Sequence, residues 1–533
     1  MVITRTRLVL LAVMAAAATT AGLVACASSA GPEGPVRVGI GPVGELVPTN
    51  LNDPDSAQVL SAVFAPLVDL DPQGRPYEVA AASVVPDQAN RVWTVTLREG
   101  MSFHNGEPVT ATSFVNAWNY GAYQPNQQRA NHLFARIEGY AALNPPPGTA
   151  PATPRLAGLE VVDERVFTVT LTEPFAHFRE MLSAPAFYPL PAAAFSSPGV
   201  LREDFKQAPV GNGPYRIVEP VTPGDPIRLR AHPAHPGPAP AADEVVLVPY
   251  QNPATAYADL LAGELDVVSE IPTDRLDTVD ADLEGRYLRH PSPVFQFLAI
   301  PTYQAELADP RVRQAISMAI DRDQVSAAGV GGQLPARSFV PPLVPGARTD
   351  TCGAACELNP DAARRLYAEA HGPDRLTITY NADGDHKAWV AAICDQLTAH
   401  LGVRCAAEPK PSLPDLLARV HYDRAEVGLL RLGWAMEYPS MESYLAPVYS
   451  TTGAGNYSGY HNAEFDALLA AAAAADSPEE AIARYQEAED LLAQDLPVIP
   501  VRFGQRTVGY SPRLAQVPLT RWGHIDLAAL QPR

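Results

Sequence analysis

The chain has 533 residues, of which 47% are hydrophobic and 18% charged, and its formal net charge is −20. This length is too great for one ordinary hydrophobic core and predicts about three domains. The composition is typical of a soluble globular protein and excludes a disordered or polytopic membrane chain. Because the negative charge repels nucleic acid and anionic lipid, and no basic groove interleaved with aromatic residues is present, we exclude nucleic-acid binding.

The first 25 residues differ from the rest of the chain. Two arginines precede an uncharged apolar stretch, Leu8–Ala21, which ends shortly before Leu23-Val-Ala-Cys26. This is the order of a secretory signal peptide. The apolar stretch is shorter than the roughly 20 residues that span a bilayer.

The sequence Leu-Val-Ala-Cys resembles the bacterial lipobox. The resemblance implies that residues 1–25 are removed and that Cys26 is lipidated. An ordinary secretory signal with an incidental cysteine is the alternative. Residues 26–35 are small and flexible, and we expect them to form a tether. The protein would then be held at the outer face of the cytoplasmic membrane by lipid alone.

Two runs early in the mature chain alternate apolar and polar residues, Val92–Leu97 and Arg165–Leu171. Alternation with a period of two and many β-branched residues predicts half-buried antiparallel strands.

From about residue 254, helical and strand patterns alternate. Helices are predicted over Ala254–Ala262, Asp309–Ala327, Asn359–Gly372, Asp385–Leu401, Leu468–Ala475 and Ser477–Gln494, several of them with a capping residue or an early proline. Strands are predicted at Val267-Val268, Val403–Ala407, Val427–Arg431 and Val498–Val501. This alternation implies α/β lobes.

Four cysteines remain after Cys26, and an even number in an exported protein favours disulfides with three possible pairings. Nearness in the sequence favours Cys352 with Cys356 and Cys394 with Cys405. A metal site is the alternative, because C-x3-C is near the spacing of metal ligands.

No sequence pattern of an enzyme is present. The chain lacks G-x-S-x-G, H-E-x-x-H and a phosphate-binding loop with its lysine, since Gly329-Val-Gly-Gly332 has no lysine after it. His232 and His235 are separated by a proline, which favours a surface turn over a metal site. We expect no catalytic residue, no metal and no cofactor.

Several stretches, in the same order along the chain, resemble the bacterial extracellular solute-binding proteins of family 5, the peptide-binding components of ABC importers. They are Leu97–Ala111 (LREGMSFHNGEPVTA), Pro209–Tyr215 (PVGNGPY), Leu261–Asp266, Asp309–Asp321, Gly433-Trp434, Tyr457–Tyr460 and Leu496–Pro500. The resemblance covers nearly all of the mature chain.

The resemblance implies a periplasmic-binding-protein-like type II fold: two α/β lobes joined by a hinge, with an inserted α+β domain. The expected boundaries are 36–72, 208–290 and 505–533 for lobe I, 73–207 for the inserted domain and 291–504 for lobe II. Ligand is expected between the lobes.

One stretch, LLRLGWAMEYPSMESYL, places charged residues among apolar ones. Charged side chains are rarely buried without a partner. In oligopeptide-binding members of the family, an aspartate three residues after the Gly-Trp tryptophan pairs with the peptide α-ammonium, and Glu437 holds that position here. The alternatives are that Glu437 pairs with an arginine of the protein or faces solvent.

The same resemblance assigns the other end of the peptide to cationic residues. Arg431 and His386 match residues that lie toward the peptide C-terminus, and Arg419 matches a further arginine. The alternatives are a surface helix residue for Arg419 and a helix cap for His386. We expect Trp434 and Tyr438 to contribute to the ligand site, with plain core as the alternative for Trp434.

These features together predict a lipid-anchored, monomeric, non-enzymatic receptor for short peptides. It would close on its ligand by a hinge motion and deliver it to an ABC permease driven by separate ATPase subunits. One alternative keeps this role but changes the cargo to haem, a metal chelate or another small solute, with His386 as a ligand. A second alternative is an envelope peptide hydrolase, which the missing nucleophile and metal motifs oppose.

Overall fold

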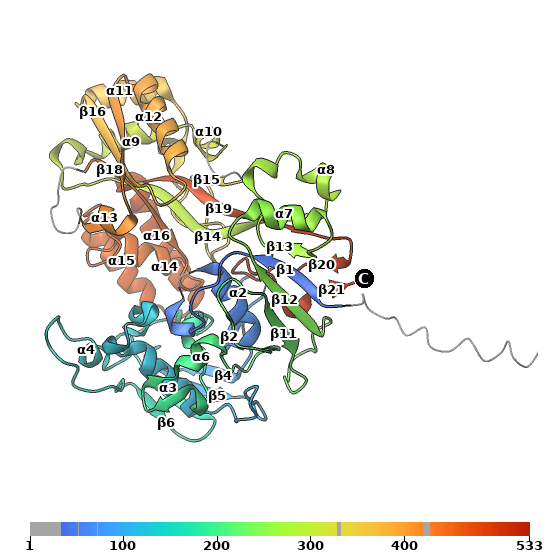
Figure 1. The fold of residues 1–533 in the computed structure, drawn as a ribbon. Coiled ribbons are helices and arrows are strands. Elements are labelled where there is room, and N and C mark those ends of the chain that lie inside the picture. The colour runs from blue at the N-terminus through green and yellow to red at the C-terminus, as the bar shows by residue number, and fades with distance from the viewer. Residues whose placement is uncertain (1–33, 52, 72, 328–331, 419, 421–426) are drawn as a thin grey trace, which may run out of the picture.

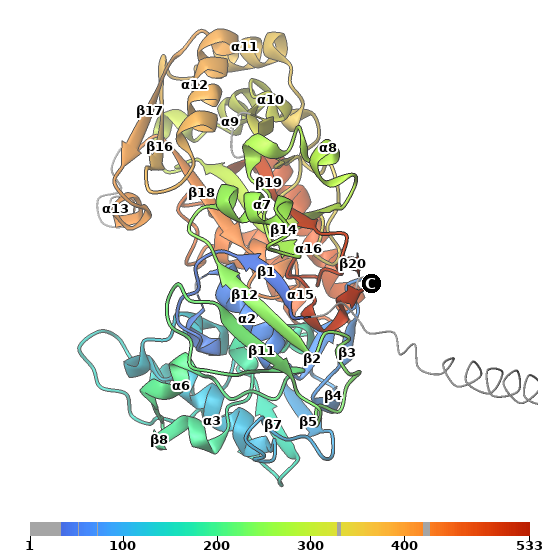
Figure 2. The same ribbon diagram turned by 45° about the vertical axis from the view of Figure 1, so that its right-hand side comes forward.

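The computed structural model describes residues 34–533 except 52, 72, 328–331, 419 and 421–426. Cys26, Arg419 and most of the glycine-rich segment 329–332 therefore lie outside the described residues. Three parts follow one another from top to bottom in both ribbon views: lobe II, lobe I and the inserted domain (Figures 1 and 2). No helix among the described residues is both long enough and apolar enough to cross a bilayer.

Lobe I is built on one half of the largest sheet. Its elements are β1 (Val36–Ile40), α2 (Pro54–Val63), β10 (Tyr215–Ile217), β11 (Ile227–Ala231), β12 (Glu244–Pro249), α7 (Pro253–Leu261), β13 (Val267–Val268) and α8 (Val279–Leu283). The strand order is β10-β11-β12-β1-β13, with β1 parallel to both of its neighbours. Two small hairpins, β2 (Val68–Leu70) with β3 (Pro76–Glu78) and β20 (Leu514–Gln516) with β21 (Gln531–Pro532), lie beside it.

The inserted domain has a four-stranded antiparallel sheet with the order β4-β5-β7-β6. Its elements are β4 (Ala81–Pro86), β5 (Val92–Leu97), α3 (Ala111–Ala122), α4 (Tyr140–Leu143), β6 (Leu159–Val161), β7 (Val166–Thr170), α5 (Phe178–Met181), β8 (Phe195–Ser197), β9 (Val200–Leu201) and α6 (Glu203–Gln207). The two alternating runs predicted as antiparallel strands are β5 and β7, which pair directly. That prediction is confirmed.

Lobe II carries the other half of the largest sheet. Its elements are α9 (Pro310–Met318), α10 (Arg322–Ala327), β15 (Leu334–Pro335), α11 (Pro360–Glu369), β16 (Arg375–Asn381), α12 (Lys387–Leu401), β17 (Arg404–Lys410), α13 (Leu413–Ala418), β18 (Leu429–Ala435), α14 (Glu442–Tyr449), α15 (Ala463–Ala473) and α16 (Pro478–Asp495). Disulfides join Cys352 to Cys356 and Cys394 to Cys405, the pairs that are nearest in sequence.

Two long strands connect the lobes, β14 (Tyr287–Ala299) and β19 (Val498–Tyr510). They pair antiparallel along their length, but the register is interrupted between Pro291 and Phe295. In lobe I β19 continues the sheet from β13, and in lobe II β14 continues it to β18. The predicted strand Val498–Val501 is thus only the beginning of a strand of 13 residues.

One predicted helix was wrong in its extent. The pattern from Asp309 to Ala327 predicted one helix, whereas the structure ends α9 at Met318 and begins α10 at Arg322. Asp321 starts the second helix by accepting a hydrogen bond from the Gln324 amide at 3.0 Å. The buried Arg322 guanidinium donates to the Ser317 carbonyl at 3.1 Å, which satisfies an acceptor at the end of the first helix.

The structure confirms that the fold class is α/β with two lobes and an inserted α+β domain. The residue boundaries of the three parts stay a prediction.

Close contacts with the backbone at the end of α2 explain the glycines of the Pro209–Tyr215 motif. The Gly213 amide donates to the Val63 carbonyl at 2.8 Å, and both Asn212 amide atoms bond to the Ala65 backbone. A Cβ on Gly211 would lie 2.0 Å from the same Val63 carbonyl oxygen, which is backbone and has little freedom to move. The motif therefore fastens the end of the inserted domain to the end of α2.

We predict that Gly211→Ala destabilises the protein by about 1–3 kcal/mol, since the new methyl group overpacks against backbone. The midpoint of denaturant unfolding measures this. Gly237→Ala is the matched control: its Cβ would meet only the His235 ring, a side chain that can turn away. Equal midpoints for the two variants would contradict the steric account.

Candidate ligand-binding site

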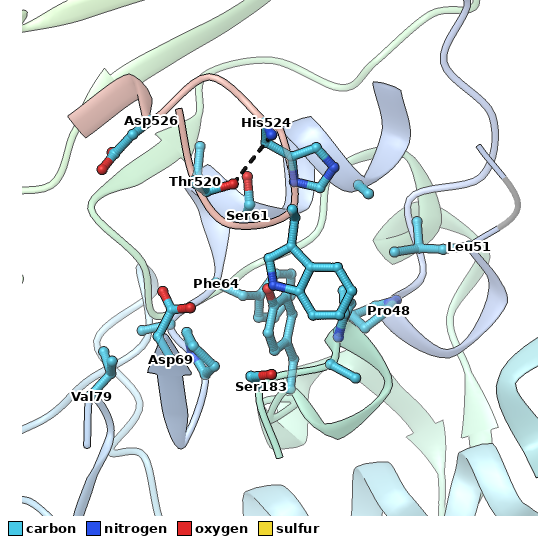
Figure 3. Close-up of a pocket in the computed structure, with 18 of the residues that line it drawn as sticks. Pro48, Leu51, Ser61, Phe64, Asp69, Val79, Ser183, Thr520, His524 and Asp526 are labelled. Atoms are coloured by element: carbon cyan, nitrogen blue, oxygen red, sulfur yellow. Dashed lines mark hydrogen bonds between the residues drawn. The ribbon is translucent and has the colours of Figure 1, made fainter. Parts of the chain in front are cut away.

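A cavity of about 1090 Å³ lies where the three parts of the molecule meet. Its lining is mostly apolar and includes Leu51, Phe64 and Trp522 from lobe I, Leu133 and Tyr188 from the inserted domain, and Pro293, Met436 and Glu437 from β14 and lobe II. Figure 3 shows part of this lining, with Pro48 and Leu51 at the right and His524 and Thr520 at the top. An apolar cavity of this size with a few polar groups is typical of small-ligand sites.

Glu437 lines the cavity and contacts the inserted domain across it. Its Oε1 lies 2.6 Å from Nε2 of His132, which belongs to the 3-10 helix Arg129–Phe134. The hydrogen bond to Glu437 raises the pKa of His132 above its ordinary value, against the opposing effect of burial. Glu437 thus pairs with a histidine of the protein, a partner that the sequence analysis did not foresee.

The strand β18 determines the direction in which the side chains before Glu437 point. Successive side chains of a strand point to opposite faces, so Arg431, Gly433 and Ala435 share one face. Gly433 and Ala435 are exposed, and Ala435 lines the cavity together with Glu437. We call these four residues the odd row: it has a cation at one end, a carboxylate at the other and two small residues between them.

The cationic end of the odd row contains more than Arg431. Arg502 on β19 pairs with Gln296 of β14, whose other partner is Gly433 of the odd row. Arg431 is 8% exposed and Arg502 is 2% exposed, and neither makes an ion pair with the described residues. Arg431 donates to the Asn381 side-chain oxygen at 3.0 Å, and Arg502 donates to that of Gln296 at 3.0 Å.

Three nitrogens at this end are buried without a hydrogen-bond partner among the described residues: Nε of Arg431, Nη1 of Arg502 and Nδ1 of His386. Burial lowers the pKa of Arg431 to about 9 and that of Arg502 to about 10. Burial, together with the charges of the two arginines, lowers the pKa of His386 to about 4, so its imidazole is neutral at pH 7. Neither guanidinium forms an ion pair with the described residues, and Asp383 and Asp385 act on them only as nearby charges, so both arginines have buried, unpaired donors of the kind that suit an anion.

Arg431, Arg502 and His386 do not line the large cavity, which reaches the odd row only at Ala435 and Glu437. His386 precedes α12, but its side chain makes no capping hydrogen bond.

Trp434 and Tyr438, the other two residues predicted at the ligand site, both make contacts within the protein. Trp434 points to the opposite face of β18 from Arg431, and its indole donates to the Ser443 carbonyl at 2.8 Å. Tyr438 is 5% exposed and packs edge-on against Phe175 of the inserted domain, 6.3 Å between ring centroids. Neither residue lines the cavity in the described part of the chain.

The edge of β18 is open beside the odd row. Its neighbour β16 pairs with it only at Leu429 and Leu430, whereas β14 pairs with it as far as Ala435. Backbone groups on one side of residues 431–435 therefore have no strand partner. Such an edge accepts an extended peptide as an additional strand.

Sequence reasoning missed two of the residues at the site. A sequence pattern could have pointed to Arg502, because it is the single charged residue in the apolar run Val498-Ile-Pro-Val-Arg-Phe503. No sequence pattern pointed to His132, because only the fold brings it to Glu437, 305 residues away in the chain.

His232, for which a surface turn was favoured over a metal site, lies edge-on to His104 with 4.8 Å between ring centroids. Among the described residues, no group of three or more His, Cys, Asp or Glu side chains could hold a metal ion.

Comparisons with known proteins agree with this architecture. The family described as bacterial extracellular solute-binding proteins, family 5 (middle), matches residues 75–456. The chain is 26% identical to the periplasmic murein peptide-binding protein MppA of Escherichia coli K12, over 83% of this chain and 82% of that protein. It is 27% identical to the periplasmic oligopeptide-binding protein OppA of Salmonella typhimurium, over 92% and 91% of the two chains.

A solved structure with a similar fold is the unliganded open form of MppA, with a TM-score of 0.81 and 22% identity over 94% of this chain and 98% of that one. The Haemophilus influenzae OppA complex with the peptide RPPGFSPFR has a TM-score of 0.73 and 21% identity, over 94% and 99% of the two chains.

The contact between His132 and Glu437 predicts the titration of His132. Its pKa is raised in the folded protein, so the His132 side of the ion pair is fully charged just below pH 6.5 and loses its charge as the pH rises from 6.5 through the raised pKa. NMR titration of the wild type should place the His132 pKa above 6.5, and in Glu437→Gln it should fall to 6.5 or below, because burial then dominates. A His132 pKa that does not change in Glu437→Gln would show that the contact is absent in solution.

Proposed function

Because the chain belongs to the bacterial extracellular solute-binding proteins of family 5, we propose that it captures short peptides between its lobes and delivers them to the permease of an ABC importer. Family membership assigns it to solute-binding proteins and not to enzymes. The finer assignment, to peptides, rests on the odd row.

The charges of the odd row match a zwitterionic peptide. Glu437 would take the α-ammonium in place of His132, and Arg431 with Arg502 would take the α-carboxylate, with His386 beside them. The open edge of β18 would pair with the peptide backbone between these ends, which gives affinity without reading side chains. Gly433 and Ala435 leave space for the ligand, since neither has a side chain larger than a methyl group.

The length of the odd row limits the length of the peptide. Arg431 and Glu437 are six residues apart, which corresponds to at most about 20 Å of extended chain. A bound peptide that meets both ends in an extended conformation therefore has no more than about six residues.

We propose the same site for peptides of different sequence. The relatives named above are described as binding murein peptide and oligopeptide. Side-chain selection would come from the cavity, whose apolar lining surrounds the Glu437 end.

The exported, lipid-anchored state is the remaining part of the proposal. The proposed lipidation at Cys26 would hold the protein, as a monomer, near the permease at the outer face of the cytoplasmic membrane.

The ammonium role predicts a difference between two forms of one peptide. Glu437→Gln should weaken binding of a free-amine tripeptide at least about tenfold, because an enclosed ammonium loses its charged partner. Binding of the N-acetylated peptide should change little. Isothermal titration calorimetry measures both, with Glu464→Gln on the exposed surface of α15 as the control. Equal losses for the two peptides would refute the role of Glu437.

If Arg431 and Arg502 bind the peptide α-carboxylate, their replacement should matter for a peptide with a free C-terminal acid and much less for its C-terminal amide. Arg431→Gln and Arg502→Gln should each weaken binding of a free-acid peptide at least about tenfold, and should affect the C-terminal amide much less. Arg365→Gln, which removes an exposed charge from α11, is the control. If the acid and the amide lose affinity equally in both variants, the buried arginines do not bind the ligand carboxylate.

Cys26→Ser should release the protein from membranes into the soluble fraction, because one thioether-linked lipid group is its proposed anchor. Metabolic labelling with a fatty acid, followed by fractionation, tests this. Labelling of the serine variant at the wild-type level would contradict lipidation at Cys26.

A further inference from the structure

The large cavity extends away from Glu437 to a second polar region. Asp69 on β2 and Asp526 on the C-terminal segment both line it, and both lie on the same side of the view in Figure 3. Phe64 and Tyr188 stack with 5.6 Å between ring centroids, and they line the cavity together with Trp522. We call this region the acidic end of the cavity.

The two carboxylates have no cationic partner. Asp69 accepts one hydrogen bond, from the Leu70 amide at 2.8 Å, and Asp526 accepts one from the Ala529 amide at 3.2 Å. Neither forms an ion pair with any described residue. The pKa of each is raised, chiefly by burial, and each carboxylate thus has more to gain from a cation than an exposed one has.

Arg98, Arg129 and Arg506 are the arginines that line the cavity, and none of them forms an ion pair with Asp69 or Asp526. Arg98 lines the cavity, but its guanidinium donates to the carbonyls of Val79 and Glu78 at 2.8 and 3.0 Å. Arg179 is paired with the Glu78 carboxylate at 2.6 Å. The protein therefore supplies no counterion for Asp69 and Asp526.

Two further polar side chains line the cavity and are almost fully buried. Tyr188 is 5% exposed and His524 is 9% exposed, and neither the Tyr188 hydroxyl nor the His524 imidazole makes a hydrogen bond to the described residues. Burial lowers the pKa of His524 to about 3, so its ring is neutral and offers one nitrogen as an acceptor. Buried polar groups normally have a partner.

We propose that the acidic end is a subsite for a primary ammonium on a side chain of the bound peptide, as in lysine or another diamino acid. This inference rests on the proposed peptide-binding function. An ammonium has three donors and no acceptor, and the subsite offers acceptors on Asp69, Asp526, Tyr188 and His524. The rings of Phe64 and Trp522 would pack against the methylene groups of such a side chain.

The test compares lysine with norleucine, which keeps the methylene chain and lacks the ammonium. Two sets of tripeptides carry lysine or norleucine at the first, second or third position among alanines. Calorimetry at pH 7 measures each dissociation constant with the wild-type protein. At one position lysine should bind at least about tenfold more tightly than norleucine.

Asp69→Asn with Asp526→Asn should abolish this preference while leaving binding of the norleucine peptide within about twofold. Asp225→Asn, which removes an exposed charge from a loop of lobe I, should leave the preference unchanged. Unchanged thermal midpoints show that the variants are folded.

The outcomes separate the two proposals. Binding of all tripeptides with no difference between lysine and norleucine at any position overturns the subsite and leaves the peptide-binding function in place. A lysine preference that survives in the double variant overturns the assignment to these two residues. A wild-type protein that binds none of the peptides refutes the proposed function and the subsite with it.

Discussion

The pairing of β14 with β19 is the constraint on which the rest of the structure depends. Each strand has 13 residues and takes part in the sheet of both lobes, so the two lobes share one continuous hydrogen-bonded ladder. The ladder is regular from Tyr287 to Pro291, is interrupted between Pro291 and Phe295, and shifts register again between Gln296 and Phe297. Ser292, Pro293 and Val294, the residues of the interruption, line the large cavity. The place where the ladder can bend is therefore a wall of the candidate site, as hinge motion around a ligand requires.

The alternation of a single strand organises the candidate site itself. Arg431 lies on the face of β18 on which Gly433 and Ala435 are exposed, and Glu437 follows two residues after the strand ends at Ala435. A change of register by one residue would turn Leu432 and Trp434 to that side instead. The pairing of β18 with β14 fixes this register through six residue pairs, from Val294 with Ala435 to Ala299 with Leu430. The strand pairing thus keeps Arg431, Gly433 and Ala435 on one face, two residues before Glu437.

The local elements could be predicted from the sequence, because their signals are local. The strand pattern of Val92–Leu97, the cap at Asp309 and the capping serine at Ser477 depend only on neighbouring residues. The site was predictable only in part. The family motif pointed to Arg431, Glu437 and Trp434 as ligand residues, which stays a prediction. The structure adds that Trp434 lies on the opposite face of β18 from Arg431.

The remaining site residues depend on contacts between distant parts of the chain. His132 meets Glu437 only when the inserted domain packs against lobe II, through contacts such as the hydrogen bond from Asn90 to the Ala475 carbonyl at 2.8 Å. Asp69 and Asp526 are 457 positions apart in the chain and share a cavity because the C-terminal segment returns to lobe I. No pattern within a window of sequence carries this information.

The contact between His132 and Glu437 makes the two ends of the odd row unequal in their electrostatics. At the carboxylate end, Glu437 already has a partner, since His132 lies 2.6 Å away, and a peptide ammonium would exchange one partner for another. At the arginine end, Arg431 and Arg502 form no ion pair with the described residues, and Asp383 and Asp385 act on them only as nearby charges, so a peptide carboxylate would add a direct partner. A zwitterionic ligand would therefore displace an existing contact at its N-terminus and add a new one at its C-terminus.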